Sequence, residues 1–135
     1  MPLINWDNSY NLNIAKIDMQ HQKLVRLINE LHEAMLAGKA KDKVGTIIFS
    51  LVEYTKTHFN DEEQIFDKHG YPGSFAHKQE HKRFVNEISK FSNDFDKGDL
   101  MLSMKVMNFL KDWLVKHIKG TDKNYVSFLA AKGVK

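Results

Sequence analysis

The sequence contains no cysteine, which excludes disulfide bonds, metal sites built from thiolates and iron–sulfur clusters. It has only two prolines in 135 residues, so the chain is free to form long helices. No apolar run approaches the roughly 18 residues of a membrane span, and the first residues lack the features of a secretory signal. Basic and acidic residues are interspersed, without the basic runs typical of nucleic-acid surfaces. We therefore expect a soluble, cytoplasmic protein that binds no nucleic acid and inserts into no membrane.

Apolar residues recur every three or four positions in four long stretches, which is the spacing of amphipathic helices. Short turn signals separate these stretches, and Gly70-Tyr71-Pro72-Gly73 is the strongest of them. Four long helices with short links predict an all-α fold, an up-down-up-down four-helix bundle. The first predicted helix runs from Met19, after Asp18 as N-cap, to about Ala37, and the second from about Lys41 to His69. The third starts after Ser74 and ends near Lys97-Gly98, with Phe95 on its apolar stripe, and the fourth follows Asp99.

The chain length favours a single domain covering residues 1–135. Residues 1–17 lack helical periodicity, so we expect an arm along the bundle with Trp6 as its anchor. Residues 18–120 form the predicted bundle, and residues 121–135 a C-terminal segment with a short helix.

Five of the seven histidines continue the apolar stripes of these helices into the interior, and Glu62 does so as well. A single histidine on such a stripe is more often a hydrogen-bonded core residue than a ligand. In an up-down-up-down bundle, however, all six residues reach one level, where burying so much polar surface without a strong partner is costly. A metal centre is the favoured partner, whereas His32 and His69 are too far along their helices to reach it. The converging residues are His21, His58, Glu62, His77, His81 and His117.

Imidazole suits zinc, copper, iron and nickel, and five imidazoles are too many for one ordinary zinc site. A second metal needs another bridging carboxylate, and Asp122 is the candidate. Its spacing of five places it about 140° around an ideal helix from His117, so the helix must widen or break near Gly120. Competing carboxylates are Glu63, Asp61 and Asp18, whose simpler interpretations are a neighbouring acid, a solvated face and a helix cap.

Four segments together resemble the hemerythrin family, in particular its single-domain bacterial members: DMQH (18–21), HFNDEE (58–63), HKQEH (77–81) and HIKGTD (117–122). The resemblance covers the whole chain and implies a non-haem centre of two iron ions. His77, His81 and His117 would bind one iron, and His21 and His58 the other. Glu62, Asp122 and an oxo or hydroxo group would bridge them, leaving an open position for O₂ on the two-histidine iron.

The function that this resemblance implies is reversible O₂ binding for transport, storage or delivery, by a protein that is not an enzyme. We expect a monomer that could pass O₂ to an O₂-consuming enzyme. Tyr125 is a candidate hydrogen-bond donor beside the site. The apolar pocket for O₂ is predicted to comprise Leu24, Phe59, Trp113, Leu114 and Ile118.

Two other functions use the same kind of centre. Di-iron oxidases or peroxidases of the ferritin-like type have carboxylate-rich sites with Glu-x-x-His on two helices, and no glutamate lies three residues before a histidine here. A sensor of O₂, NO or redox state usually joins this domain to an output module, for which 135 residues leave no room. Signalling through a separate partner stays open.

Overall fold

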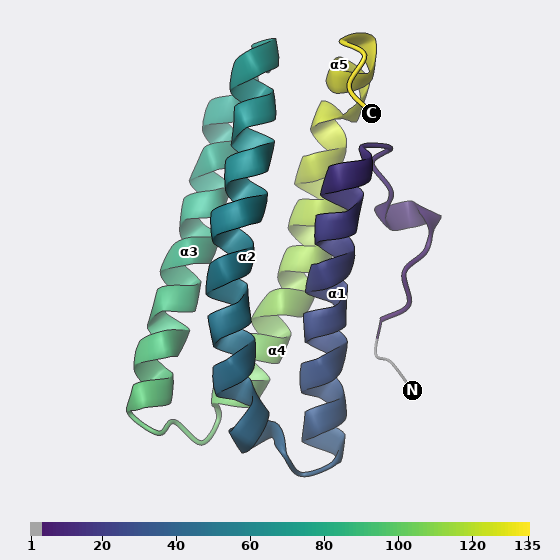
Figure 1. Cartoon of the computed structure of the whole chain (residues 1–135). Coiled ribbons are helices and arrows are strands. Elements are labelled where there is room, and N and C mark those ends of the chain that lie inside the picture. Colours follow the sequence, from purple (N-terminus) through teal and green to yellow (C-terminus); the bar gives the residue numbers. More distant parts are fainter. Residues whose placement is uncertain (1–3) are drawn as a thin grey trace.

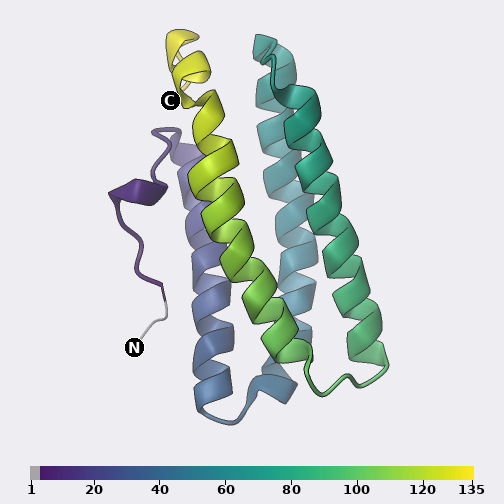
Figure 2. The same cartoon turned by 180° about the vertical axis from the view of Figure 1, so that it is seen from behind.

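The computed structural model describes residues 4–135, in which the chain forms helices and no strand. The first three residues of the predicted arm lie outside the described residues. Neighbouring helices run in opposite directions side by side, which confirms the all-α, up-down-up-down bundle (Figures 1 and 2). The bundle helices are α1 (Ala15–Leu36), α2 (Ala40–His69), α3 (Ser74–Asp96) and α4 (Leu102–Trp113); η1 (Asn8–Tyr10) precedes them, and η2 (Leu114–Thr121), η3 (Asp122–Tyr125) and α5 (Val126–Ala131) follow.

Helix α1 begins at Ala15, so the predicted start at Met19 with Asp18 as N-cap is wrong. Asp18 lies in the first turn, where a carboxylate interacts favourably with the helix dipole. Its two oxygens accept hydrogen bonds from the backbone N–H groups of Leu12 and Asn13, at 2.8 and 3.1 Å. Asp18 therefore holds the arm against the helix instead of capping it.

The arm lies along the bundle and is fixed by polar and aromatic contacts. The backbone of Ile4 exchanges two hydrogen bonds with the Asn29 side chain on α1, at 2.9 and 2.8 Å. Trp6 stacks on Tyr10 with ring centroids 5.1 Å apart, and its indole N–H donates to Asn11 Oδ1 at 3.0 Å. Trp6 is half-buried against the core, as expected for an anchor.

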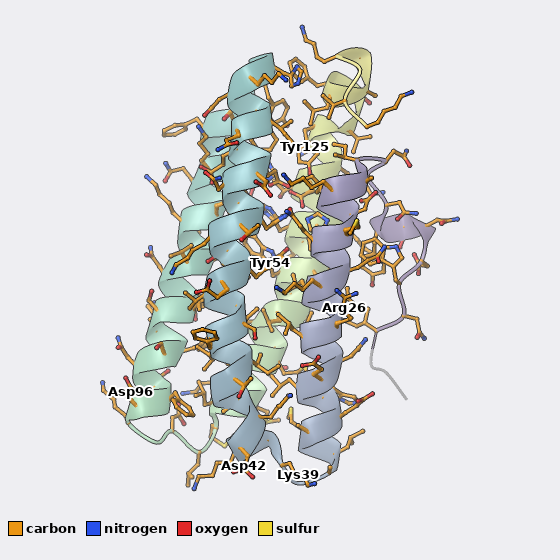
Figure 3. All side chains as sticks on the ribbon, in the orientation of Figure 1. Arg26, Lys39, Asp42, Tyr54, Asp96 and Tyr125 are labelled. Carbon is orange, nitrogen blue, oxygen red and sulfur yellow. The ribbon has the colours of Figure 1, made fainter. Side chains whose placement is uncertain are left out.

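The apolar core has two parts, and the predicted metal-binding residues are buried with them. The larger part fills the space between the four helices, and polar residues such as Arg26 and Asp42 lie outside it (Figure 3). Phe95 does not join it, contrary to its predicted place on the stripe, and is 45% exposed, because α3 ends one residue later. The smaller part, at the end of the bundle where α5 lies, comprises Leu12, Ile14, Ile17, Phe66, Tyr125 and Leu129. None of the helices within residues 4–135 is long and apolar enough to cross a lipid bilayer.

The last helix of the bundle widens into the π-helix η2, which is one of the two outcomes, a widening or a break, that the five-residue spacing between His117 and Asp122 predicts. The N–H of Asp122 donates to the carbonyl of His117, the i→i+5 bond of a π-helix, so that both side chains face the interior. A Cβ at Gly120 would meet only the Val115 carbonyl, at 3.9 Å, so the widening does not require glycine there. The arm contacts this segment, since Lys119 lies 4.3 Å from the centre of the Tyr10 ring.

Candidate metal centre

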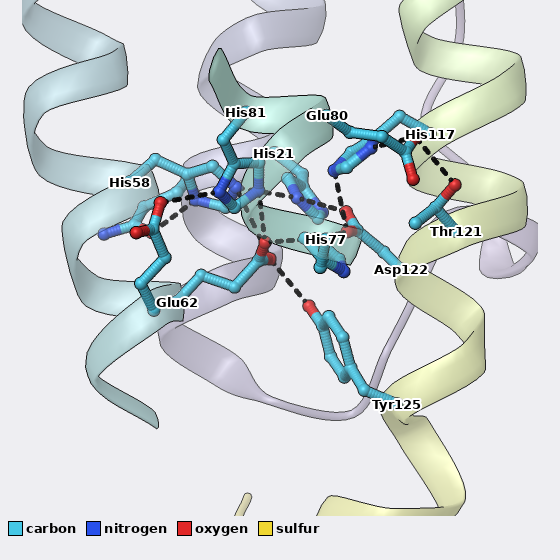
Figure 4. Close-up of polar contacts among 12 residues, drawn as sticks. His21, His58, Glu62, His77, Glu80, His81, His117, Thr121, Asp122 and Tyr125 are labelled. Carbon is cyan, nitrogen blue, oxygen red and sulfur yellow. Dashed lines mark hydrogen bonds and ion pairs between the residues drawn. The ribbon is translucent and has the colours of Figure 1, made fainter. Parts of the chain in front are cut away.

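All seven predicted metal ligands lie at one level of the bundle, and each is at most 2% exposed. They come from α1, α2, α3 and the segments η2 and η3 that continue α4, so no local segment could form this site by itself (Figure 4). The residues brought together are His21, His58, Glu62, His77, His81, His117 and Asp122.

Three histidines gather around two carboxylate oxygens, one from Glu62 and one from Asp122. His77 Nε2 lies 2.7 Å from Glu62 Oε1 and 2.8 Å from Asp122 Oδ1. His81 Nε2 lies 2.9 Å from the same Glu62 oxygen, and His117 Nε2 lies 3.0 Å from the same Asp122 oxygen. Donor atoms of Glu62 and the three histidines fall within 4.8 Å of one another, so this group could hold one ion.

The other two histidines lie near the remaining carboxylate oxygens, one histidine at each carboxylate. His21 Nε2 lies 3.2 Å from Asp122 Oδ2, and His58 Nε2 lies 3.7 Å from Glu62 Oε2. The two Nε2 atoms are 3.1 Å apart. Each carboxylate therefore directs one oxygen to the three-histidine group, where it lies near two of the rings, and the other oxygen to one ring of the two-histidine group. A carboxylate that bridges two ions is arranged in this way.

Several of these buried atoms have no hydrogen-bond partner within residues 4–135, although they lie close together. They include Glu62 Oε1, both carboxylate oxygens of Asp122, and Nε2 of His77, His81 and His117. Contacts of 2.7–3.0 Å without hydrogen-bond angles indicate lone pairs that converge on a shared point instead of on one another. Unpaired buried polar atoms cost several kcal/mol, which a bound cation would offset. The donor set therefore fits a metal centre.

The outward nitrogens of two histidines donate to glutamates, of which only Glu63 was a predicted candidate for the site. His81 Nδ1 donates to Glu63 Oε2 at 2.9 Å, so Glu63 orients a ring and is not among the converging groups. His117 Nδ1 donates to Glu80 Oε1 at 3.1 Å, and the Thr121 hydroxyl donates to the same oxygen at 3.0 Å. Such contacts set the tautomer that leaves Nε2 free for a metal. Glu80 was missed, although it lies directly before His81 in HKQEH.

His58 is oriented by an amide. Its Nδ1 donates to Gln20 Oε1 at 2.7 Å, and Gln20 Nε2 donates to Asp61 Oδ2 at 2.7 Å. Asp61 also contacts Lys16 at 3.3 Å and so remains at the edge of the site. Gln20 was not predicted to have this role either, although it is next to His21 in DMQH.

Tyr125, from η3, lies where it was expected as a donor. Its buried hydroxyl donates to Glu62 Oε2 at 2.8 Å (Figure 4). That oxygen is the one that faces His58. Tyr125 therefore fixes the carboxylate on the two-histidine side.

The five residues predicted to form the apolar pocket lie in or against the larger core around the site. Phe59 stacks on His81 with centroids 3.8 Å apart, and Trp113 stacks on His117 at 3.9 Å. These two rings therefore cover the three-histidine group. The remaining three, Leu24, Leu114 and Ile118, are buried aliphatic residues.

The pKa values of the titratable groups at the site are shifted by burial and by contacts with neighbouring groups. Burial and the Asp122 charge would raise the pKa of Glu62, but contacts with His77 and His81 outweigh them and hold it below its usual value. Burial lowers the pKa of His58 to about 3, so this ring is neutral near pH 7. Burial also opposes charge on His77, yet its contacts with Asp122 and Glu62 raise the pKa to about 10.

Metal uptake by the metal-free protein is expected to release a proton from His77. Because its pKa of about 10 lies above neutrality, the ring is protonated near pH 7 and must lose this proton to bind a metal. The apparent affinity for Fe²⁺ should therefore increase about tenfold per pH unit for each released proton. Anaerobic titration against a competing chelator at several pH values measures this slope. An affinity that does not change around neutral pH would contradict protonation of His77.

Comparison with known proteins agrees with this geometry. The family model described as "Hemerythrin HHE cation binding domain" matches residues 12–129. The chain is 33% identical over 131 residues to a bacteriohemerythrin of Stenotrophomonas maltophilia, covering 97% of this chain and 84% of that protein. It is 31% identical over 132 residues to a bacteriohemerythrin of Methylococcus capsulatus, covering 97% and 100%.

A similar solved structure is a crystal structure of wild-type hemerythrin, with a TM-score of 0.82 and 30% identity. The match covers 93% of this chain and 96% of that one. Both the sequence relationship and the shared fold extend over nearly the whole molecule. The chain belongs to the hemerythrin family.

Proposed function

We propose that this protein binds O₂ reversibly at a pair of iron ions. One ion would be held by His77, His81 and His117 and the other by His21 and His58, with Glu62 and Asp122 shared. The observation that carries the proposal is the division of the two carboxylates, each with one oxygen towards the three-histidine group and the other towards the two-histidine group.

When bound and reduced, the two irons would supply the two electrons that reversible O₂ binding takes, one from each. The three-histidine side offers five protein donors, counting three nitrogens and two carboxylate oxygens, whereas the two-histidine side offers four. We therefore assign O₂ to the two-histidine side. This leaves the three-histidine side as the more completely ligated neighbour.

The chain's other residues favour binding of O₂ over its consumption. Leu24, Leu114 and Ile118 are buried, so the surroundings of the ligands are poor in water that could deliver protons. Glu63 and Glu80 are engaged with His81 and His117. Tyr125 is engaged with Glu62. None of these groups is placed as a mobile acid that would drive further reduction of O₂.

Anaerobic reconstitution with iron tests the proposal. We expect two iron ions per chain and uptake of one O₂ per iron pair, with release of O₂ when its pressure is lowered. The metal content and the O₂ exchanged are measured on the same sample. Uptake of one zinc ion and no iron, or continuous O₂ consumption with a reducing substrate, would contradict it.

A further inference from the structure

Tyr54 has a hydroxyl that its packing does not explain. The side chain lies on α2, one turn before His58, and is 2% exposed. No group of residues 4–135 forms a hydrogen bond with the hydroxyl. A phenylalanine would fill the same space without burying an unpaired polar atom, which normally destabilises a protein. The hydroxyl therefore indicates a partner that is not part of the chain.

The ring of Tyr54 lies against the two-histidine side of the site. It stacks on the His58 ring with centroids 5.0 Å apart and planes at 15°, and it packs edge-on against Phe59 with centroids 6.4 Å apart. Figure 3 shows Tyr54 in the interior between α1 and α2. Its hydroxyl is therefore a buried donor on a ring packed against His58.

The other tyrosine at the site, Tyr125, already has a hydrogen-bond partner in the chain. The Tyr125 hydroxyl is already used, because it donates to Glu62 at 2.8 Å. The aliphatic residues predicted for the pocket, Leu24, Leu114 and Ile118, offer no donor at all. Within residues 4–135, two buried side chains at the two-histidine group have an unengaged polar atom outside the converging Nε2 and carboxylate atoms: His21, through Nδ1, and Tyr54, through its hydroxyl. His21 is itself a predicted metal ligand, so Tyr54 is the one that offers a donor from outside the ligand set.

We propose that the Tyr54 hydroxyl donates a hydrogen bond to the small ligand that enters the two-histidine side of the centre. This inference rests on the proposed function. The ligand class is O₂ and small anions, because a fixed donor in a dry site stabilises negative charge on a ligand. Tyr54 thereby acts as a selectivity and affinity determinant in a pocket whose other predicted walls are apolar.

The variant Tyr54→Phe, which removes only the hydroxyl, tests this proposal with azide as the probe. In the ferric, iron-loaded protein, the Kd for azide is expected to rise about tenfold, about 1.4 kcal/mol. The Tm of the metal-free variant should be equal to or higher than that of the parent, because an unpaired buried hydroxyl is removed. Tyr10→Phe is the matched control: this tyrosine is also buried but packs on Trp6 of the arm, and we expect it to leave azide affinity unchanged.

Two iron ions per chain together with unchanged azide affinity in Tyr54→Phe would overturn the proposal while leaving the proposed function intact. A lower Tm of the metal-free variant would overturn it too, because the hydroxyl would then have a structural partner such as an ordered water. If the parent protein takes up no iron pair, the proposed function fails first and this inference fails with it.

Discussion

Replacing Glu62 by glutamine is expected to lower the iron content from two ions per chain to one at most and to abolish O₂ binding. Glu62 belongs to both groups of converging residues, since its Oε1 faces His77 and His81 and its Oε2 faces His58. Glutamine has nearly the same shape but offers one neutral oxygen and an NH₂ group that cannot bind a metal. Iron analysis after anaerobic reconstitution, together with O₂ uptake, measures the effect.

The matched control for this variant is Glu53→Gln, which changes an exposed glutamate on the same helix. It should retain both irons. The helix content of both variants is compared by circular dichroism, so that loss of the fold is recognised. A folded Glu62→Gln protein with two irons per chain would show that Glu62 is not a shared ligand.

Replacing Leu114 by alanine is expected to shorten the lifetime of the oxygenated protein at least about tenfold. Leu114 is 1% exposed and lies three residues before His117, in the π-helix that carries this predicted ligand. Truncation leaves a cavity near the site and should also lower the free energy of unfolding by about 2–5 kcal/mol. A cavity beside buried polar groups admits water, which supplies protons and promotes irreversible oxidation. The decay of the oxygenated spectrum in air gives the lifetime.

The control variant Leu31→Ala separates the effect of Leu114→Ala on stability from its effect on the oxygenated lifetime. Leu31 is also a fully buried core leucine, but it lies ten residues beyond His21 along α1, about 15 Å along the helix axis. It should cost similar stability and leave the oxygenated lifetime unchanged. Equal oxygenated lifetimes for Leu114→Ala and Leu31→Ala would show that Leu114 does not shield the site from water.

The helices and the level of the histidines could be predicted because both depend on periodicity within single segments. The three-to-four spacing that buries Leu51 also buries His58 and Glu62. The spacing of five between His117 and Asp122 likewise implied that the helix widens or breaks there, since an α-helix would separate the two side chains, and the structure has the widening. These features follow from local geometry and the direction of each helix.

Other features depend on contacts between distant segments, and sequence spacing does not report them. Asp18 resembles an N-cap, but its oxygens accept hydrogen bonds from the arm, and the helix starts before it. Gln20 and Glu80 orient histidines on other helices, so their role depends on how the helices are rotated against each other. Phe95 fits its stripe by spacing but lies at the very end of α3, where the core no longer covers it.

The most direct measurement is the optical spectrum of the reduced, iron-loaded protein through one cycle of air and deoxygenation. Reversible O₂ binding at the iron pair predicts a charge-transfer band that appears in air, disappears when O₂ is removed and returns in a second cycle. The absence of such a band would contradict the proposed function. So would an oxidised spectrum that persists after deoxygenation, because O₂ would then be consumed at the centre instead of released.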